Sequence, residues 1–325
     1  MEIMESKTYL ETFMKLHPIA PFEPIRTEII PTSSDWITQI KWDGVRMLTY
    51  FDGHEVRLMN RKQNDRTNQY PELLAIQTYC SATSCIIDGE IIAFDQKKPA
   101  FHEVMKRESL RNKKSIDLAL SRTPITYMIF DIVMYNDIWL LDRPLLDRQK
   151  ILEEVIIPNS NVQITQNFAD GNKLFEVMKE HGMEGVISKD LRGKYLIGGK
   201  DTRWQKKKIF HDLYAVIGGV TLRNGIVNAL LLGLFDQGNL HYIGHAGTGK
   251  LSNNDWRNLT QLIQSKIISE RPFANEPARS NEAIWLKPEH TVKVQFLEWT
   301  SNGTMRHPSI QSLVDVQITD CTFQQ

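Results

Sequence analysis

Short runs of β-branched and aromatic residues follow one another along this chain, and few segments have helical spacing. This pattern limits the fold more than any other feature, because strand-like runs outnumber helical ones without a regular alternation, which predicts an α+β fold. Strands are expected at residues 36–42, 46–51, 85–94, 125–135 and 185–188, the first two forming a hairpin. Helices are expected at residues 71–79, 148–155 and 172–181, and Gly182 can supply the left-handed cap of the last one.

The texture changes after Lys208. Strand-like runs are expected at residues 214–222, 228–235, 240–243 and 291–299, with one helix at 253–268, which together suit a small barrel. Ser252 is the expected N-cap of this helix, with Asp255 three residues later. One helical face carries an apolar stripe that should pack on the barrel: Trp256, Leu259, Ile263 and Ile267. A chain of 325 residues suits two domains, which we place at residues 1–208 and 209–325.

Composition indicates a soluble, cytoplasmic protein. Hydrophobic residues make up 41% of the chain, but no apolar run is long enough to span a bilayer and the first residues lack a signal-peptide core. The three cysteines, Cys80, Cys85 and Cys321, give neither a disulfide framework nor a four-thiolate zinc site. Because 39 basic residues balance 39 acidic ones, a nucleic-acid surface would have to come from local clusters, such as those at residues 57–66, 106–114 and 206–208. Most such clusters are solvated faces.

The chemistry is concentrated in residues 41–46, a lysine at a strand end followed by a turn and an arginine. An amine forms a phosphorus–nitrogen bond only when it is deprotonated, so a nucleophilic Lys41 needs burial or nearby cations, which Arg46 and two further lysines could supply. Gly44 lets the backbone turn beneath a nucleotide. These residues alone fit an ordinary β-turn equally well.

A second glycine-rich stretch, residues 244–250, matches most of a P-loop. Leu251 stands where that loop needs a serine or threonine for magnesium, and the flanking segments are too few for a parallel P-loop sheet. We interpret it as a turn from barrel to helix.

Further motifs follow Lys41-x-Asp-Gly-x-Arg in a characteristic order. They are Asn60-Arg61 before Tyr70-Pro71-Glu72-Leu73, Asp88-Gly89-Glu90, residues 127–131, Arg143-Pro144-Leu145, residues 184–189, residues 204–208, residues 217–219 and residues 285–288. In this order the chain resembles the covalent nucleotidyltransferases that are ATP-dependent DNA ligases, and most of all the ligase domain of bacterial end-joining ligase D. The resemblance covers nearly the whole chain.

The resemblance implies roles for individual residues. Lys41 would carry AMP, Glu184 would bind Mg²⁺ or Mn²⁺, and Arg61 would contact the nick phosphate. The nucleotide would be bound by six residues: Gln39, Arg46, Glu90, Phe130, Lys206 and Lys208. Among these, Glu90 would meet the ribose hydroxyls and Phe130 would stack on adenine.

The sequence itself supports the roles of Lys206 and Lys208, and it departs from the family at Gln39. Lys206 and Lys208 alternate along a strand, so both can face the α-phosphate while Lys207 points away. Gln39 stands where ligase D relatives usually carry glutamate, and its amide could still meet the adenine edge.

The fold implied by the resemblance is a nucleotidyltransferase domain of antiparallel sheets with flanking helices, followed by an oligonucleotide-binding (OB-fold) barrel, with ATP bound between them. The implied activity is ATP-dependent sealing of 5′-phosphate/3′-hydroxyl nicks in DNA repair or end joining. The expected partners of the monomer are nicked duplex DNA and a Ku-type end-binding protein, with no membrane. NAD-dependent ligases are disfavoured because three cysteines cannot build their zinc site.

Two alternatives stay open. An RNA ligase or a GTP-using capping enzyme would share the Lys41 motif. A non-catalytic nucleic-acid-binding module is suggested by the last motif, where relatives carry an arginine and an Asp-Lys pair but this chain has Leu313-Val314-Asp315-Val316-Gln317. Only Arg306 remains there as a cation that could orient the leaving pyrophosphate.

Overall fold

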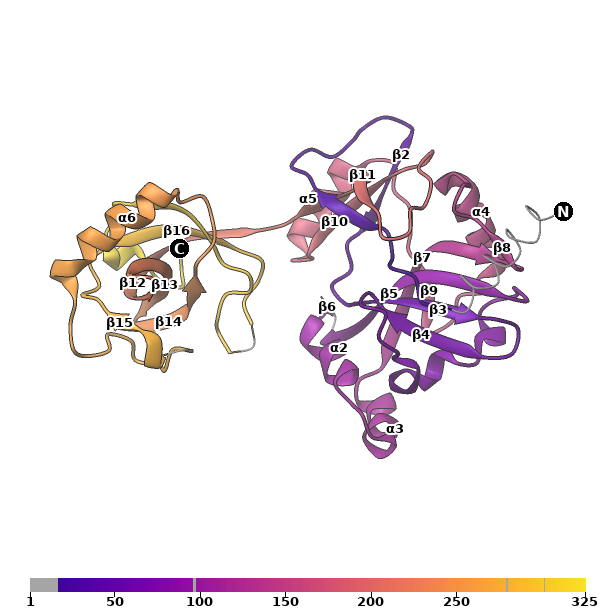
Figure 1. The fold of residues 1–325 in the computed structure, drawn as a ribbon, viewed down its shortest axis with the longest axis horizontal. Coiled ribbons are helices and arrows are strands. Elements are labelled where there is room, and N and C mark those ends of the chain that lie inside the picture. Colours follow the sequence, from indigo (N-terminus) through magenta and orange to yellow (C-terminus); the bar gives the residue numbers. More distant parts are fainter. Residues whose placement is uncertain (1–16, 96–97, 279, 301) are drawn as a thin grey trace. The chain divides into compact units, whose positions relative to one another are not determined.

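The computed structural model describes residues 17–95, 98–278, 280–300 and 302–325 (Figure 1). The chain divides into two compact units, Met1–Ile209 and Phe210–Gln325. The α+β class predicted from the sequence is confirmed, with antiparallel sheets and few helices.

The first unit contains a seven-stranded sheet in the order β4-β3-β5-β7-β8, with β6 on β5 and β9 on β7. Its pairs are antiparallel apart from β7 with β9. The strands are β3 (Val45–Phe51), β4 (Val56–Asn60), β5 (Cys85–Asp95), β6 (Lys98–Pro99), β7 (Ile125–Tyr135), β8 (Ile138–Trp139) and β9 (Val162–Ile164). Helices α2 (Phe101–Glu108), α3 (Lys113–Arg122) and α4 (Leu145–Val155) also belong to this unit.

A second, four-stranded sheet has the order β1-β11-β10-β2. It consists of β1 (Glu23–Arg26), β2 (Trp36–Ile40), β10 (Gly185–Asp190) and β11 (Lys200–Lys208). Helix α5 (Gly171–Glu180) contacts β10 and β2. Its C-cap is His181, and the φ of +62° at the following Gly182 agrees with the predicted left-handed cap.

Buried side chains divide this unit into layers. One cluster joins residues of both sheets: Ile19, Phe22, Leu48, Tyr50, Met59, Ile86, Val133, Met134, Tyr195 and Trp204. A larger cluster lies on the other side of the seven-stranded sheet and includes Val104 of α2 and Leu152 of α4. A smaller one lies between α5 and the four-stranded sheet and includes Leu174 and Val186. The two sheets therefore face each other and are covered by helices on their outer sides.

The predicted hairpin of residues 36–42 and 46–51 is wrong. Strand β2 pairs with β10, whereas β3 pairs with β4 and β5. The segment between them crosses from one sheet to the other, and a Cβ at Gly44 would lie 2.2 Å from the carbonyl oxygen of Ile91. Glycine is needed here for close backbone approach.

The helix predicted at residues 71–79 is also wrong. Residues 71–79 form two short 3₁₀ turns, Pro71–Leu73 and Ile76–Thr78, because the backbone of Ala75 (φ −80°, ψ 61°) leaves the helical region. Arg107, in the basic cluster at residues 106–114, is an exception to the solvated faces expected of most such clusters. It is fully buried on α2 and donates to Glu72 at 2.9 Å.

The second unit is built on a six-stranded antiparallel sheet, β14-β13-β12-β16-β17 with β15 on β12. Its strands are β12 (His211–Arg223), β13 (Ile226–Asp236), β14 (Asn239–Ala246), β15 (Ile284–Trp285), β16 (Thr291–Phe296) and β17 (Ser309–Val314). The segment after the edge strand β14 pairs with the other edge strand, β17. The backbone N–H of Lys250 donates to Ile310 O at 2.8 Å, and the backbone N–H of Ile310 donates to Thr248 O at 2.9 Å. These bonds close the sheet into a barrel.

The glycine-rich stretch forms the predicted turn from β14 to helix α6 (Asn253–Leu262). Ser252 and Asp255 form a complete capping box. Leu259 and Ile263 are buried as expected, but Ile267 is about half exposed because the helix tightens into a 3₁₀ turn at Ile263–Lys266. This rotation takes Ile267 off the apolar stripe.

Candidate active site

Lys41 lies one residue beyond β2, and its position is set by the four-stranded sheet. Its backbone N–H donates to Gly185 O at 3.0 Å. Strand β10 lies between β2 and β11, with Val186 opposite Ile40 and Gly185 opposite Lys208. Glu184, just before β10, therefore lies between the end of β2, which leads into Lys41, and the end of β11, which carries Lys208.

Glu184 bridges two lysines. One carboxylate oxygen contacts Lys41 Nζ, and the other lies 2.8 Å from Lys208 Nζ. Burial alone would raise the pKa of Glu184, but Lys41 and Lys208 outweigh it and hold the pKa below its usual value. The carboxylate is therefore charged and keeps both amines at the same point.

Lys206 adds a third cation on the same face of β11. Burial lowers the pKa of Lys206, and the nearby charges of Lys41 and Lys208 lower it further. Lys207 points to the opposite face, where its Nζ lies 4.4 Å from the ring centroid of Phe175 on α5. The predicted alternation of these lysines is observed, and it gathers the other three amines where an anion could bind.

Arg46, on β3, is held by the seven-stranded sheet. It donates to both oxygens of Asp88 on β5, from Nε at 2.9 Å and from Nη2 at 2.6 Å. Burial would lower the pKa of Arg46, but Asp88 reverses the effect and raises it. Tyr195 also donates to Asp88, at 2.8 Å. Asp88, the first residue of the Asp88-Gly89-Glu90 motif, thus orients Arg46.

Phe130, on β7, is part of an aromatic and cationic group. The guanidinium of Arg46 lies 5.3 Å from its ring centroid, and Lys189 Nζ lies 4.2 Å from it and 4.0 Å from the Trp204 ring. Lys189 is fully buried, which lowers its pKa to about 7, although Asp131 opposes the shift. Lys189 and Trp204 were not assigned roles from the sequence. Trp204 alternates with Lys206 and Lys208 along β11, so its side chain is expected on the same face as theirs. Lys189 lies opposite Trp204 on β10 and therefore shares that face.

Glu90 lies opposite Arg46 across the β3–β5 pair. Burial raises its pKa to about 8, although Lys41 and Arg46 oppose the rise. Near neutral pH a protonated Glu90 can donate as well as accept a hydrogen bond, which suits a sugar hydroxyl.

The remaining predicted site residues lie in different surroundings. Gln39 is buried, and its Nε2 donates to Asn167 at 2.7 Å. Arg61 is exposed in the turn after β4, with Glu23 at 3.7 Å. Arg306 belongs to the second unit and forms an ion pair with Glu298 at 2.6 Å.

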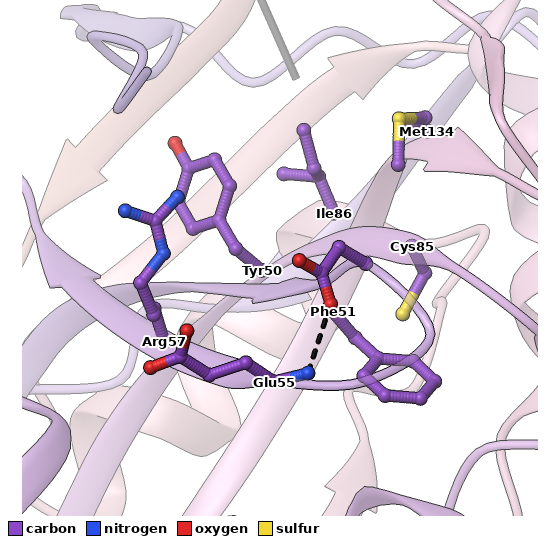
Figure 2. A pocket seen from close by; sticks show the side chains of 8 residues that line it. Tyr50, Phe51, Glu55, Arg57, Cys85, Ile86 and Met134 are labelled. Atoms are coloured by element: carbon purple, nitrogen blue, oxygen red, sulfur yellow. Dashed lines mark hydrogen bonds between the residues drawn. The ribbon is translucent and has the colours of Figure 1, made fainter. Parts of the chain in front are cut away.

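A small pocket near the β3–β4 turn is not part of this site (Figure 2). Its lining residues are Tyr50, Phe51, Asp52, Glu55, Arg57, Cys85, Ile86 and Met134. The volume of about 10 Å³ has room for about one water molecule, so a nucleotide cannot enter. Among the described residues, no group of three or more His, Cys, Asp or Glu side chains is placed to hold a metal ion. No helix within the described ranges has the length and apolarity to cross a membrane.

Two family models match this chain. The ATP dependent DNA ligase domain matches residues 19–208, and the ATP dependent DNA ligase C terminal region matches residues 223–316. The chain belongs to the ATP-dependent DNA ligases. The matched ranges cover Lys41 and the other predicted site residues, from Gln39 to Arg306.

Relatives of this ligase chain include end-joining proteins. It is 31% identical to the multifunctional non-homologous end joining DNA repair protein LigD of Mycobacterium tuberculosis, over 288 residues that cover 86% of this chain and 36% of that protein. It is 25% identical to a DNA ligase of Methanosphaera stadtmanae, over 331 residues covering 93% and 57%. The chain thus spans about a third of the mycobacterial relative's length.

Solved structures agree with this family. The ligase domain of M. tuberculosis LigD is 27% identical, with a TM-score of 0.52 over 94% of this chain and 98% of that one. A mycobacterial DNA ligase D complexed with ATP and MES gives 27% identity and a TM-score of 0.53 over the same shares. These neighbours support the assignment of a nucleotidyltransferase fold to the first unit and an OB fold to the second.

Proposed function

We propose that this chain seals nicks in duplex DNA with ATP, through an AMP bound covalently to Lys41. The observation that carries the proposal is the meeting of Lys41 and Lys208 at Glu184, with Lys206 close to both lysines on the same face of the four-stranded sheet. Three amines close together can bind a triphosphate. Among them, Lys41 is the first residue of the segment that crosses from the four-stranded sheet to the seven-stranded sheet.

The reaction has three displacements at phosphorus. The neutral Lys41 amine forms a bond to the α-phosphorus of ATP while the bond to pyrophosphate breaks. The 5′-phosphate of the nick then takes the AMP and releases the Lys41 amine. The 3′-hydroxyl finally attacks that phosphate and AMP leaves. Lys206 and Lys208 stabilise the charge on the α-phosphate, and positioned cations of this kind supply most of the acceleration in phosphoryl transfer.

Other residues orient the nucleotide. Glu90 binds the ribose hydroxyls, Phe130 stacks on the base, and Arg46, fixed by Asp88, contributes its remaining donors to the sugar or phosphate. Arg61, exposed beyond β4, contacts the nick phosphate. Arg306 orients the pyrophosphate.

Glu184 fits the divalent ion of this family. Mg²⁺ usually takes one or two protein carboxylates and fills its other positions with water and substrate phosphates, so a single charged carboxylate beside the phosphate site is a suitable donor set. Mg²⁺ or Mn²⁺ would neutralise phosphate charge there. Glu184 would then exchange part of its contact with Lys41 and Lys208 for the ion.

The biological setting follows from the relatives. The names of the mycobacterial proteins support a role in DNA repair by end joining. A Ku-type end-binding protein as partner and a place at the nucleoid in the bacterial cytoplasm are further parts of the proposal. A monomer suffices for the proposed chemistry. An RNA ligase or GTP-using capping enzyme receives no support from the family models, both of which are those of DNA ligases.

The test is a labelling experiment. The chain is incubated with α-labelled ATP or GTP and then chased with nicked DNA or nicked RNA. We expect a covalent adduct from ATP that disappears on nicked DNA as sealed product forms, and no adduct in Lys41→Ala. Lys207→Ala is the matched control, since Lys207 lies on the opposite face. An adduct of normal yield in Lys41→Ala would overturn the proposal.

A further inference from the structure

Three side-chain amides form a continuous hydrogen-bonded relay between β2 and β7. Gln39 Nε2 donates to Asn167 Oδ1 at 2.7 Å, and Asn167 Nδ2 donates to Gln149 Oε1 at 3.0 Å. Gln149 Nε2 donates to the backbone carbonyl of Phe130 at 2.8 Å. Gln39 and Gln149 are buried, with exposed fractions of 2% and 4%.

The direction of the relay is determined by its last member. A backbone carbonyl can only accept, so the end of Gln149 that faces Phe130 must be its NH₂ group. The oxygen of Gln149 must then face Asn167, which has to donate to it, and the oxygen of Asn167 must face Gln39. Each amide is therefore oriented by the next one, and a flipped amide at any position would place two oxygens or two NH₂ groups together.

The consequence lies at Gln39. Its NH₂ group is committed to Asn167, and no hydrogen bond among the described residues uses its Oε1. Gln39 is two residues before Lys41, opposite Ile187 across the β2–β10 pair, on the face that carries the proposed nucleotide site. A free carbonyl oxygen there can accept a hydrogen bond but cannot donate one.

We propose that Asn167 and Gln149 are specificity-determining positioning residues, which orient the Gln39 amide so that its oxygen accepts from the 6-amino group of adenine. This deepens the proposed function and rests on it. A purine with an oxygen at position 6 would place two acceptors against each other, and a site with a buried, unmatched polar group rejects such an analogue strongly. A glutamate at this position would present an acceptor in either orientation, whereas glutamine does so only when its flip is prevented.

The relay also ties this selection to the stacking platform. Because it ends on the carbonyl of Phe130, the acceptor on β2 and the proposed adenine platform on β7 are held in one network. Neither Asn167 nor Gln149 need touch the nucleotide. Their effect would appear in the choice of base rather than in the chemistry at Lys41.

The experiment compares ATP with ITP, whose hypoxanthine base has an oxygen at position 6 and lacks the 2-amino group of guanine. The rate of Lys41 adduct formation is measured with each nucleotide, and their ratio is the readout. In Asn167→Leu the Gln39 amide can flip, and we expect the preference for ATP to fall by at least about tenfold, the contribution of one correctly matched hydrogen bond. Asn167→Asp is the matched control. Its carboxylate still accepts from Gln39, so Gln39 must donate to it and the preference should be retained. Asn167→Asp and Asn167→Leu both lose the donor to Gln149, so the comparison between them isolates the contact with Gln39.

A rescue completes the test. Adding Gln39→Glu to Asn167→Leu should restore the preference for ATP, because a carboxylate needs no partner to present an acceptor. A purely structural role for Asn167 would slow both nucleotides alike and leave the ratio unchanged. An unchanged ratio in Asn167→Leu, an equal loss in Asn167→Asp, or a failed rescue would each overturn the inference. A wild-type chain that forms no adduct with either nucleotide would instead overturn the proposed function itself, and the inference with it.

Discussion

Replacing Arg148 with methionine tests how the first unit holds the strand that carries Phe130. The Arg148 side chain, on α4, and its partner Asp131, next to Phe130 on β7, are both fully buried. Arg148 donates from Nε and Nη2 to the two oxygens of Asp131, at 2.8 and 2.9 Å. Its Nη1 donates to the carbonyls of Arg143 and Gly193, at 2.7 and 3.1 Å. One guanidinium therefore joins a helix, a strand and two connecting segments.

The expected cost follows from what Arg148→Met leaves behind. Asp131 would keep the N–H of Ile132, at 2.8 Å, but would lose its only buried counter-charge among the described residues within ion-pair distance. Removing one partner of a buried pair typically costs about 3–5 kcal/mol. The two carbonyls that lose a donor add to this, so we expect the free energy of unfolding to fall by about 4 kcal/mol or more. Replacing both Asp131 and Arg148 by apolar residues should cost less than Arg148→Met alone, since no charge is then left unpaired.

Hydrogen exchange read by mass spectrometry measures this locally. The peptide that covers β7 should exchange faster in Arg148→Met, while peptides from β12 and β13 in the second unit serve as the internal control. Urea unfolding gives the free energy. A loss below about 1 kcal/mol, or a double variant that loses the sum of the two single variants, would refute the reasoning, because the pair would then contribute no more than an exposed one.

Three further predictions concern the site. Lys206→Ala should slow Lys41 adduct formation by about 10²–10³-fold, as removal of one hydrogen-bond donor to a transition state does. Single-turnover rates should show a much smaller effect for Lys207→Ala, and equal losses would contradict the placement of Lys206 and Lys207 on opposite faces of β11. Burial lowers the pKa of Lys189 to about 7, so the folded state binds its proton less tightly than the unfolded state, and stability should rise with pH above 7. In urea unfolding, the difference in free energy of unfolding between wild type and Lys189→Met should rise by up to ~1.4 kcal/mol per pH unit from pH 7 toward the ordinary lysine pKa. A difference that does not change with pH would mean that the Phe130 and Trp204 rings keep the Lys189 ammonium charged. Arg306→Ala should lower Lys41 adenylylation more than sealing of pre-adenylylated nicks, because only the first step expels pyrophosphate; equal losses would place Arg306 on the DNA backbone instead.

Local sequence determined much of this protein. Strand β7 has the bounds that its β-branched run predicts, Ser252 and Asp255 form the capping box, and Gly182 takes the left-handed conformation. These features depend on residues within a few positions of each other, so they can be recognised without a fold. The ordered motifs around Lys41 likewise predicted the family that the comparisons confirm.

Only the tertiary structure decided which segments pair and what each polar group faces. Residues 36–42 and 46–51 are adjacent in sequence but belong to different sheets, since their partners β10 and β5 lie far along the chain. The burial of Arg107 within a basic cluster could not be predicted locally, because its partner Glu72 lies 35 positions away in the sequence.

The same holds at the candidate site. The pair of Lys41 with Glu184 joins residues 143 positions apart, and the bond from Gln39 to Asn167 spans 128. A motif can supply an amine or an amide, but the ion pair of that amine and the direction of that amide depend on partners that only folding brings within hydrogen-bond distance.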